Sequence, residues 1–126
     1  MNRHEFLKIL PALSVGTQLP YTSADDLQTI AIPPFLTSGD TIALTSPAGY
    51  ITLEEIQPAK LLMESWGFKI LVGNTIGKRD FTFGGTDAER LADLQSMLDN
   101  RNVQAIMCAR GGYGVNRILD QLNLSQ

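Results

Sequence analysis

Short apolar runs alternate with amphipathic segments over residues 40–122. Three β-prone runs occupy 40–46, 68–72 and 103–109, and the last is nearly continuous in apolar residues, as is typical of a buried parallel strand. Between them, apolar residues recur at helical spacing, first over 53–66 and then over 87–98. The order strand, helix, strand, helix, strand, helix predicts an α/β fold with an open parallel sheet, right-handed crossovers and strand order 2-1-3.

Local signals predict where the helices begin and end. Thr86 and Glu89 have the spacing of a capping box, and Gly67 stands where helices commonly stop. Pro58 lies inside the first helix, so we expect a kink or a delayed start there. A third helix is expected after Gly114, at the end of the chain.

Residues 1–38 have a different pattern. Residues 1–24 combine a positive start with an apolar stretch that is too short to span a membrane, and they are similar to a secretory signal. Their start resembles the twin-arginine export pattern, with His4 in place of the second arginine, so export to the periplasm and a cytoplasmic location both stay open. Residues 25–38 contain Pro33 and Pro34 and have linker chemistry. We expect the folded domain to span 39–126.

Composition narrows the chemistry. The 126 residues carry a net charge of −3 with no cluster of Lys and Arg, so a nucleic acid partner is not expected. One Cys excludes a disulfide framework and a Cys-rich zinc site, and one His, His4, excludes a multi-histidine metal centre. We therefore expect no metal, no cofactor and no Ser-His-Asp triad within this chain.

The glycine-rich run Arg110-Gly111-Gly112-Tyr113-Gly114 follows the third predicted strand. Together with the 46–49 loop, it falls at the carboxyl ends of the strands, where open parallel sheets bind ligands. Glycines let a ligand approach backbone amides, which could then hold a phosphate, a carboxylate or a developing oxyanion. The spacing matches neither a P-loop nor the dinucleotide fingerprint, and a tight turn without a ligand is the alternative.

Structural roles are expected for the other conspicuous side chains. We expect Cys108 to be a buried structural thiol and Trp66 to be a core anchor at the end of the first helix. Residues 78–80 are expected to form a solvated loop. The polar residues of the second helix are expected to form a solvated face with i,i+3 pairing; they are Asp87, Arg90 and Asp93.

Four blocks, at 39–49, 64–68, 83–94 and 110–119, resemble in order and spacing the N-terminal domain of the LD-carboxypeptidases. This serine-peptidase family also contains the microcin C immunity hydrolases. The resemblance implies a two-domain enzyme whose N-terminal α/β domain is flavodoxin-like and similar to class I glutamine amidotransferases.

The resemblance also implies an activity. These enzymes remove the terminal D-alanine from murein tetrapeptides by cutting an L,D-peptide bond during peptidoglycan turnover, with a Ser-His-Glu triad and no metal. It implies that Gly111 or Gly112 donates a backbone N–H to the oxyanion, and that Gly114, Tyr113 and Arg110 shape the site.

The reacting groups are not expected in this chain. The family's nucleophile block, Gly-(aromatic or His)-Ser-Asp, does not occur before Gln126, and neither Ser46 nor Ser125 is expected to replace it. We therefore expect residues 39–126 to be an incomplete N-terminal domain, inactive alone, that lacks its C-terminal domain and acts on murein peptides in the full-length enzyme.

The alternative is a stand-alone flavodoxin-like module that binds a small anion. The two hypotheses differ in one physical prediction. If the domain is incomplete, the 2-1-3 order leaves the third strand as an exposed apolar edge, which predicts self-association, whereas a well-folded monomer favours the stand-alone module. A homodimer stays open.

Overall fold

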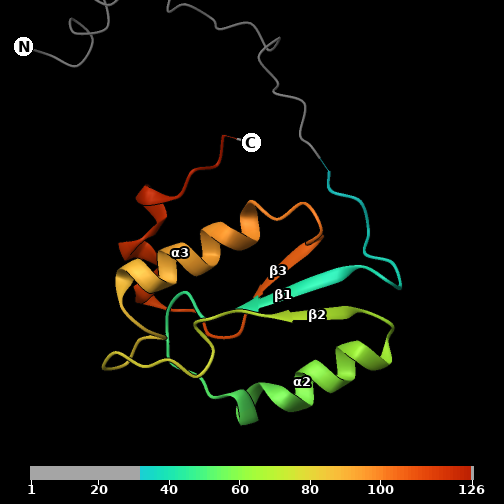
Figure 1. Ribbon diagram of the computed structural model, residues 1–126, viewed down its shortest axis with the longest axis horizontal. Coiled ribbons are helices and arrows are strands. Elements are labelled where there is room, and N and C mark those ends of the chain that lie inside the picture. Colours follow the sequence, from blue (N-terminus) through green and yellow to red (C-terminus); the bar gives the residue numbers. More distant parts are fainter. Residues whose placement is uncertain (1–31, 126) are drawn as a thin grey trace, which may run out of the picture. The chain divides into compact units, whose positions relative to one another are not determined.

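The computed structural model describes residues 32–125, so the predicted leader at 1–24 lies outside the described residues. Within the described part, the elements in order are β1 (Thr41–Thr45), α2 (Leu53–Ser65), β2 (Lys69–Val72), α3 (Asp87–Leu98) and β3 (Ala105–Cys108), followed by the 3₁₀ turns η3 (Tyr113–Arg117) and η4 (Leu119–Gln121) (Figure 1). No helix among residues 32–125 has the length and apolar character needed to cross a membrane.

The strands form one parallel sheet of order β2-β1-β3, with Thr41 opposite Lys69 and Ile42 opposite Ala105. The predicted open parallel sheet and strand order are therefore confirmed. Figure 1 shows α2 and α3 on opposite sides of this sheet. The three strands all end toward the same edge, so the loops that follow them meet there.

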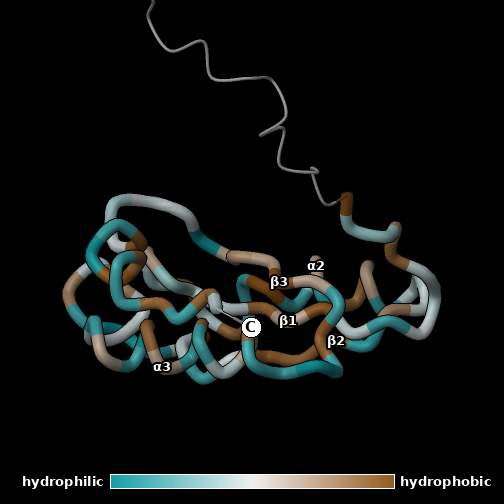
Figure 2. Tube along the Cα trace, turned by 90° about the horizontal axis from the view of Figure 1, so that it is seen from above, coloured by the Kyte–Doolittle hydropathy of each residue, from teal (hydrophilic) through white to brown (hydrophobic). Residues whose placement is uncertain are grey.

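The core lies on both faces of β1, the central strand. Ile42 and Leu44 pack on one face with Ile56 and Met63 of α2. The next position, Thr45, faces α3 and is fully buried. Figure 2 shows the strands as largely hydrophobic and the outer loops as largely hydrophilic, the distribution expected for a sheet covered by helices.

Both long helices begin with a capping box. Thr86 and Glu89 cap α3 as predicted, and Thr52 pairs with Glu55 in the same way at the start of α2. Helix α2 begins directly after Thr52 and contains Pro58 in its interior, so the start is not delayed.

The expectation for Trp66 was wrong. Its side chain is 60% exposed, because the core positions near the end of α2 are taken by Met63 and Phe68.

The predicted third helix is also replaced, by the 3₁₀ turns η3 and η4. Gly112 precedes η3 with φ 135°, and no side chain caps its first turn. Ile118, with φ −119°, separates the two turns and is fully buried. Burial of Ile118 thus fixes this segment without a continuous α-helix.

Strand β3 is shorter and more exposed than its apolar sequence predicts. It covers 105–108, and Met107 is 45% exposed. Cys108 is exposed too, which makes the prediction of a buried thiol wrong. The physical reason is position: β3 lies at one edge of the sheet, whereas β1 lies between two strands.

Candidate functional site

Three loops meet at the carboxyl edge of the sheet: 46–49 after β1, 73–85 after β2 and 109–114 after β3. The first two are joined by backbone hydrogen bonds. The Tyr50 amide donates to the Thr82 carbonyl at 2.9 Å, and the Gly84 amide donates to the Ala48 carbonyl at 3.0 Å. These bonds make the loops after β1 and β2 a single surface beside the glycine-rich run.

A cavity of about 340 Å³ lies between this surface and the glycine-rich run. It is lined by Ala48, Gly49, Thr82, Phe83, Gly111, Gly112, Tyr113 and Gly114. Four of the five residues predicted for the site therefore line one cavity. Arg110 does not line it: its Nη2 lies 3.7 Å from a carboxylate oxygen of Glu55 at the start of α2.

Gly111 and Gly112 present backbone to this cavity. Both residues are exposed, and neither amide donates to a protein acceptor within the described residues. Gly112 has φ 135°, a conformation that favours glycine. A Cβ on Gly111 would meet no atom within 4 Å. The pair therefore offers two N–H donors at the cavity wall.

Gly114 is buried where the run passes under the neighbouring loops. A Cβ at this position would lie 2.8 Å from Nη1 of Arg90, 2.8 Å from Cδ1 of Phe83 and 2.9 Å from Cα of Ala48. Real Cβ atoms do not approach that closely, so this close packing requires glycine.

Arg90, on α3, is fully buried. Its Nη1 donates to the carbonyls of Pro47 and Gly114 at 2.7 Å each, and its Nε donates to the carbonyl of Gly85 at 3.1 Å. Its charge is paired with Asp87. The guanidinium also lies over the Phe83 ring, 4.7 Å from the centroid.

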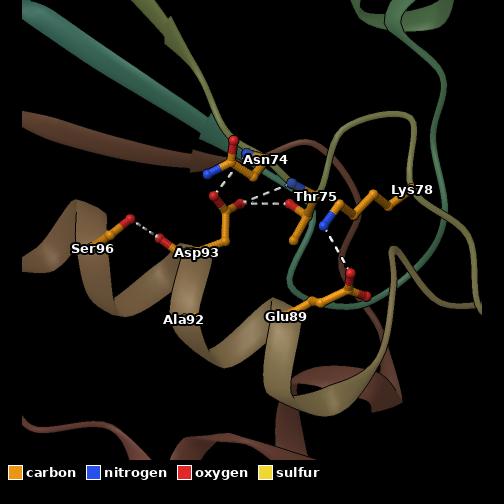
Figure 3. A pocket seen from close by; sticks show the side chains of 7 residues that line it. All are labelled: Asn74, Thr75, Lys78, Glu89, Ala92, Asp93 and Ser96. Atoms are coloured by element: carbon orange, nitrogen blue, oxygen red, sulfur yellow. Dashed lines mark hydrogen bonds and ion pairs between the residues drawn. The ribbon is translucent and has the colours of Figure 1, made fainter.

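Asp93 is the second buried charge of α3. Its carboxylate accepts from the Thr75 hydroxyl at 2.6 Å and from the backbone amides of Asn74 and Thr75 (Figure 3). It also accepts from the Thr45 hydroxyl at 2.8 Å. Thr75 Oγ1 in turn accepts from the Ser46 amide at 2.9 Å. Asp93 thereby ties the ends of β1 and β2 to α3.

The prediction of a solvated face on this helix was thus wrong for Arg90 and Asp93. The buried residues of α3 are Arg90, Asp93, Leu94 and Met97, at the spacing i, i+3, i+4, i+7. That spacing was available in the sequence, but two of its four members are charged.

Asp87, which is half-buried, forms ion pairs with two arginines, Arg90 and Arg117. Nε and Nη2 of Arg117 both approach one of its carboxylate oxygens to 2.8 Å. The hydrogen bond from Arg117, aided by the charges of Arg117 and Arg90, holds the pKa of Asp87 below its usual value. The same contact raises the pKa of Arg117.

Ser46, which was not expected to be a nucleophile, is fully buried, and its hydroxyl donates to the Gly49 carbonyl. In the loop after β2, Lys78 and Arg79 are exposed, as predicted. Lys78 pairs with Glu89 at 2.7 Å beside a second cavity of about 310 Å³, which lies between α3 and the loop after β2 (Figure 3).

Comparison with known families places this site in context. The LD-carboxypeptidase N-terminal domain family (Peptidase_S66) matches residues 42–126. The chain is 33% identical over 93 residues to a Bacillus subtilis protein named "probable murein peptide carboxypeptidase", covering 74% of this chain and 29% of that protein. It is 30% identical over 82 residues to the murein tetrapeptide carboxypeptidase of Pseudomonas aeruginosa, covering 65% of this chain and 27% of the relative.

Solved structures show the same likeness. The structure of MccF, a microcin C7 self-immunity protein, in complex with glutamyl sulfamoyl guanosine matches with a TM-score of 0.64 and 28% identity. The match covers 73% of this chain and 28% of that one. The chain therefore spans somewhat under one third of the length of the relatives it matches.

Proposed function

Because the chain belongs to the LD-carboxypeptidase family, we propose that it forms the oxyanion side of the active site of a serine carboxypeptidase. The proposed reaction is hydrolysis of the L,D-peptide bond to the terminal D-alanine of murein tetrapeptides. The substrate class is supported by the names of two relatives, a murein peptide carboxypeptidase and a murein tetrapeptide carboxypeptidase.

The observation that carries this proposal is the pair of free amides at Gly111 and Gly112 on a cavity wall. A scissile carbonyl placed there would gain negative charge on its oxygen as the nucleophile attacks. Fixed N–H donors stabilise that charge at no cost of reorganisation, and each is typically worth ~3–4 kcal/mol of barrier. Tyr113 and Gly114 line the same cavity, and Arg110 lies at its edge beside Gly49.

The remaining reacting groups are proposed to come from the part of the full-length enzyme that this chain does not align with. The sole histidine, His4, precedes the folded domain, and Ser46 is buried. The nucleophilic Ser, the Glu and the His are thus proposed to follow Gln126. The 126-residue chain alone is then expected to release no D-alanine.

A chimera tests the proposal. In it, residues 39–126 replace the aligned segment of the Pseudomonas aeruginosa murein tetrapeptide carboxypeptidase, and D-alanine release from tetrapeptide is measured. The chimera is expected to be active. Gly111→Pro, which deletes one amide, is expected to lower kcat by roughly 100-fold or more. Gly111→Ala keeps the amide and meets open space, so its loss should be much smaller.

Two results would contradict the proposal: a folded chimera without activity, or equal kcat values for Gly111→Pro and Gly111→Ala. Release of D-alanine by the unfused 126-residue chain would contradict the expected location of the triad.

The same free amides also favour the second candidate, a module that binds a small anion. In that case, inorganic phosphate or acetate should raise the Tm of the 126-residue chain, and the shift should grow as the concentration of the anion rises above its Kd. The Gly111→Pro substitution should abolish that shift, while the chimera stays inactive.

A further inference from the structure

Arg90 reaches all three loops around the cavity from a single position on α3. Its acceptors are Pro47 after β1, Gly85 after β2 and Gly114 after β3. We propose that Arg90 is a positioning residue that holds the amides of Gly111 and Gly112 at the cavity wall. This inference rests on the proposed function, because it assigns a role within the same site.

The contact with Gly114 is the decisive one. Arg90 donates to the Gly114 carbonyl at 2.7 Å, and the Phe83 ring packs so close to the same glycine that a Cβ there would lie 2.8 Å from its Cδ1. A loop that is held by one carbonyl and packed against a ring has few orientations left. The amides of Gly111 and Gly112, directly upstream, then keep the direction that the turn at Gly112 gives them.

The geometry requires a guanidinium and not merely a positive charge. A planar fork can donate to several carbonyls at fixed angles, whereas an ammonium is a compact point charge on a flexible stem. Because Arg90 is fully buried, no water can readily take over a bond that a shorter side chain fails to make.

Arg117 provides a matched control. It also pairs with Asp87 and also lies over the Phe83 ring, 5.5 Å from the centroid. It makes no hydrogen bond to a loop carbonyl among the described residues, and it is exposed. The two arginines therefore share their charge partner and ring and differ in the contacts to the loops.

The first test uses the active chimera. Arg90→Lys is expected to lower kcat at least about tenfold with KM changed less than about twofold, since an amide aimed at the oxyanion acts chiefly in the transition state. Arg117→Lys is expected to leave both constants within about twofold. In Arg90→Ala, added guanidinium ion is expected to restore part of the lost kcat.

A second test measures the loop itself in the 126-residue chain. In ¹⁵N-glycine spectra, Arg90→Lys is expected to shift the amide peaks of Gly111 and Gly112 and to leave those of Gly39 and Gly77 in place. This measurement does not depend on activity, so it separates the inference from the proposed function.

The outcomes are distinct. An inactive unsubstituted chimera contradicts the proposed function, and the spectra then decide the role of Arg90 alone. An Arg90→Lys protein with unchanged kcat and unchanged Gly111 and Gly112 peaks overturns the inference. If Arg90→Lys fails to fold, Arg90→Gln takes its place: its neutral side chain buries no unpaired charge and is too short to reach all three carbonyls, so unchanged kcat and unchanged peaks there overturn the inference as well.

Discussion

At the scale of single residues, two buried charges determine how the site is held. Arg90 donates hydrogen bonds to three loop carbonyls, and Asp93 accepts hydrogen bonds from two hydroxyls and two backbone amides at the ends of the strands. No buried side-chain N or O atom in the described part lacks a partner. The backbone hydrogen-bond ladders end where the strands pass into loops. There, each of these two charged side chains makes several hydrogen bonds to the loops and strand ends.

Asp93→Asn should destabilise the fold by about 2–3 kcal/mol. The side-chain amide of Asn would place its own N–H donors against the hydroxyl and amide donors from which Asp93 accepts hydrogen bonds. The measurement is urea unfolding of the 126-residue chain, with Asp120→Asn as control. Asp120 is exposed in η4, and its replacement should change the free energy of unfolding by less than about 0.5 kcal/mol. Equal effects of the two substitutions would contradict the structural role of Asp93.

Cys108 should react with thiol reagents in the native state, since its side chain is exposed at the edge of the sheet. Partial burial raises the pKa of its thiol, so the thiolate fraction at neutral pH is small. The expected result is one modified thiol per native chain, at a rate that keeps rising above pH 8.5. A thiol that reacts only in denaturant would support the original prediction of burial instead.

At the scale of elements, the capping box of α3 makes stability depend on pH. Hydrogen bonds from Lys78 and Thr86 lower the pKa of Glu89 to about 2, so the folded state favours its ionised form. This contribution is fully present above the ordinary glutamate pKa, near 4.3, and is lost as the pH falls through about 2.

Glu89→Gln should therefore destabilise the protein at pH 7, and the difference from wild type should shrink progressively below pH 4.5. Urea unfolding between pH 2 and 7 measures this, with Glu54→Gln in the first turn of α2 as the control. Because Glu89 and Lys78 are partly exposed, 0.5 M salt should reduce the effect. A penalty that does not change with pH would exclude this mechanism.

Features that are determined by residues close in sequence were predictable, and features that depend on contacts with residues distant in sequence were not. Thr86 caps its helix through residues three positions away, so the sequence alone identifies the start of α3. Arg90 was missed because its acceptors lie in loops up to 43 positions distant. The segment after Gly112 was predicted as α-helix from its apolar spacing, but it forms two 3₁₀ turns separated by the fully buried Ile118. The cavity residues, in contrast, followed from the rule that parallel strands gather their loops at one edge.

At the scale of the whole molecule, the 2-1-3 order that assembles the site also exposes β3. This strand pairs with β1 on one side, and within residues 32–125 no strand pairs with its other side. Met107 is 45% exposed, and a shallow cavity of about 260 Å³ adjoins the strand between Met97 and Ile106. An unpaired, apolar strand edge is a template for pairing with another chain.

The 126-residue chain is therefore expected to self-associate as its concentration rises, and Met107→Lys is expected to weaken that association at least about tenfold, because a charge on an edge strand opposes pairing. Sedimentation of both proteins at matched concentrations measures the effect. Leu61→Lys is the control: Leu61 is 55% exposed on α2, so the same charge is added away from the edge. If wild type stays monomeric, the exposed strand does not act as an interface. If Leu61→Lys weakens association as much as Met107→Lys, the exposed strand is not the specific interface, and the apolar surface of α2 becomes the next candidate.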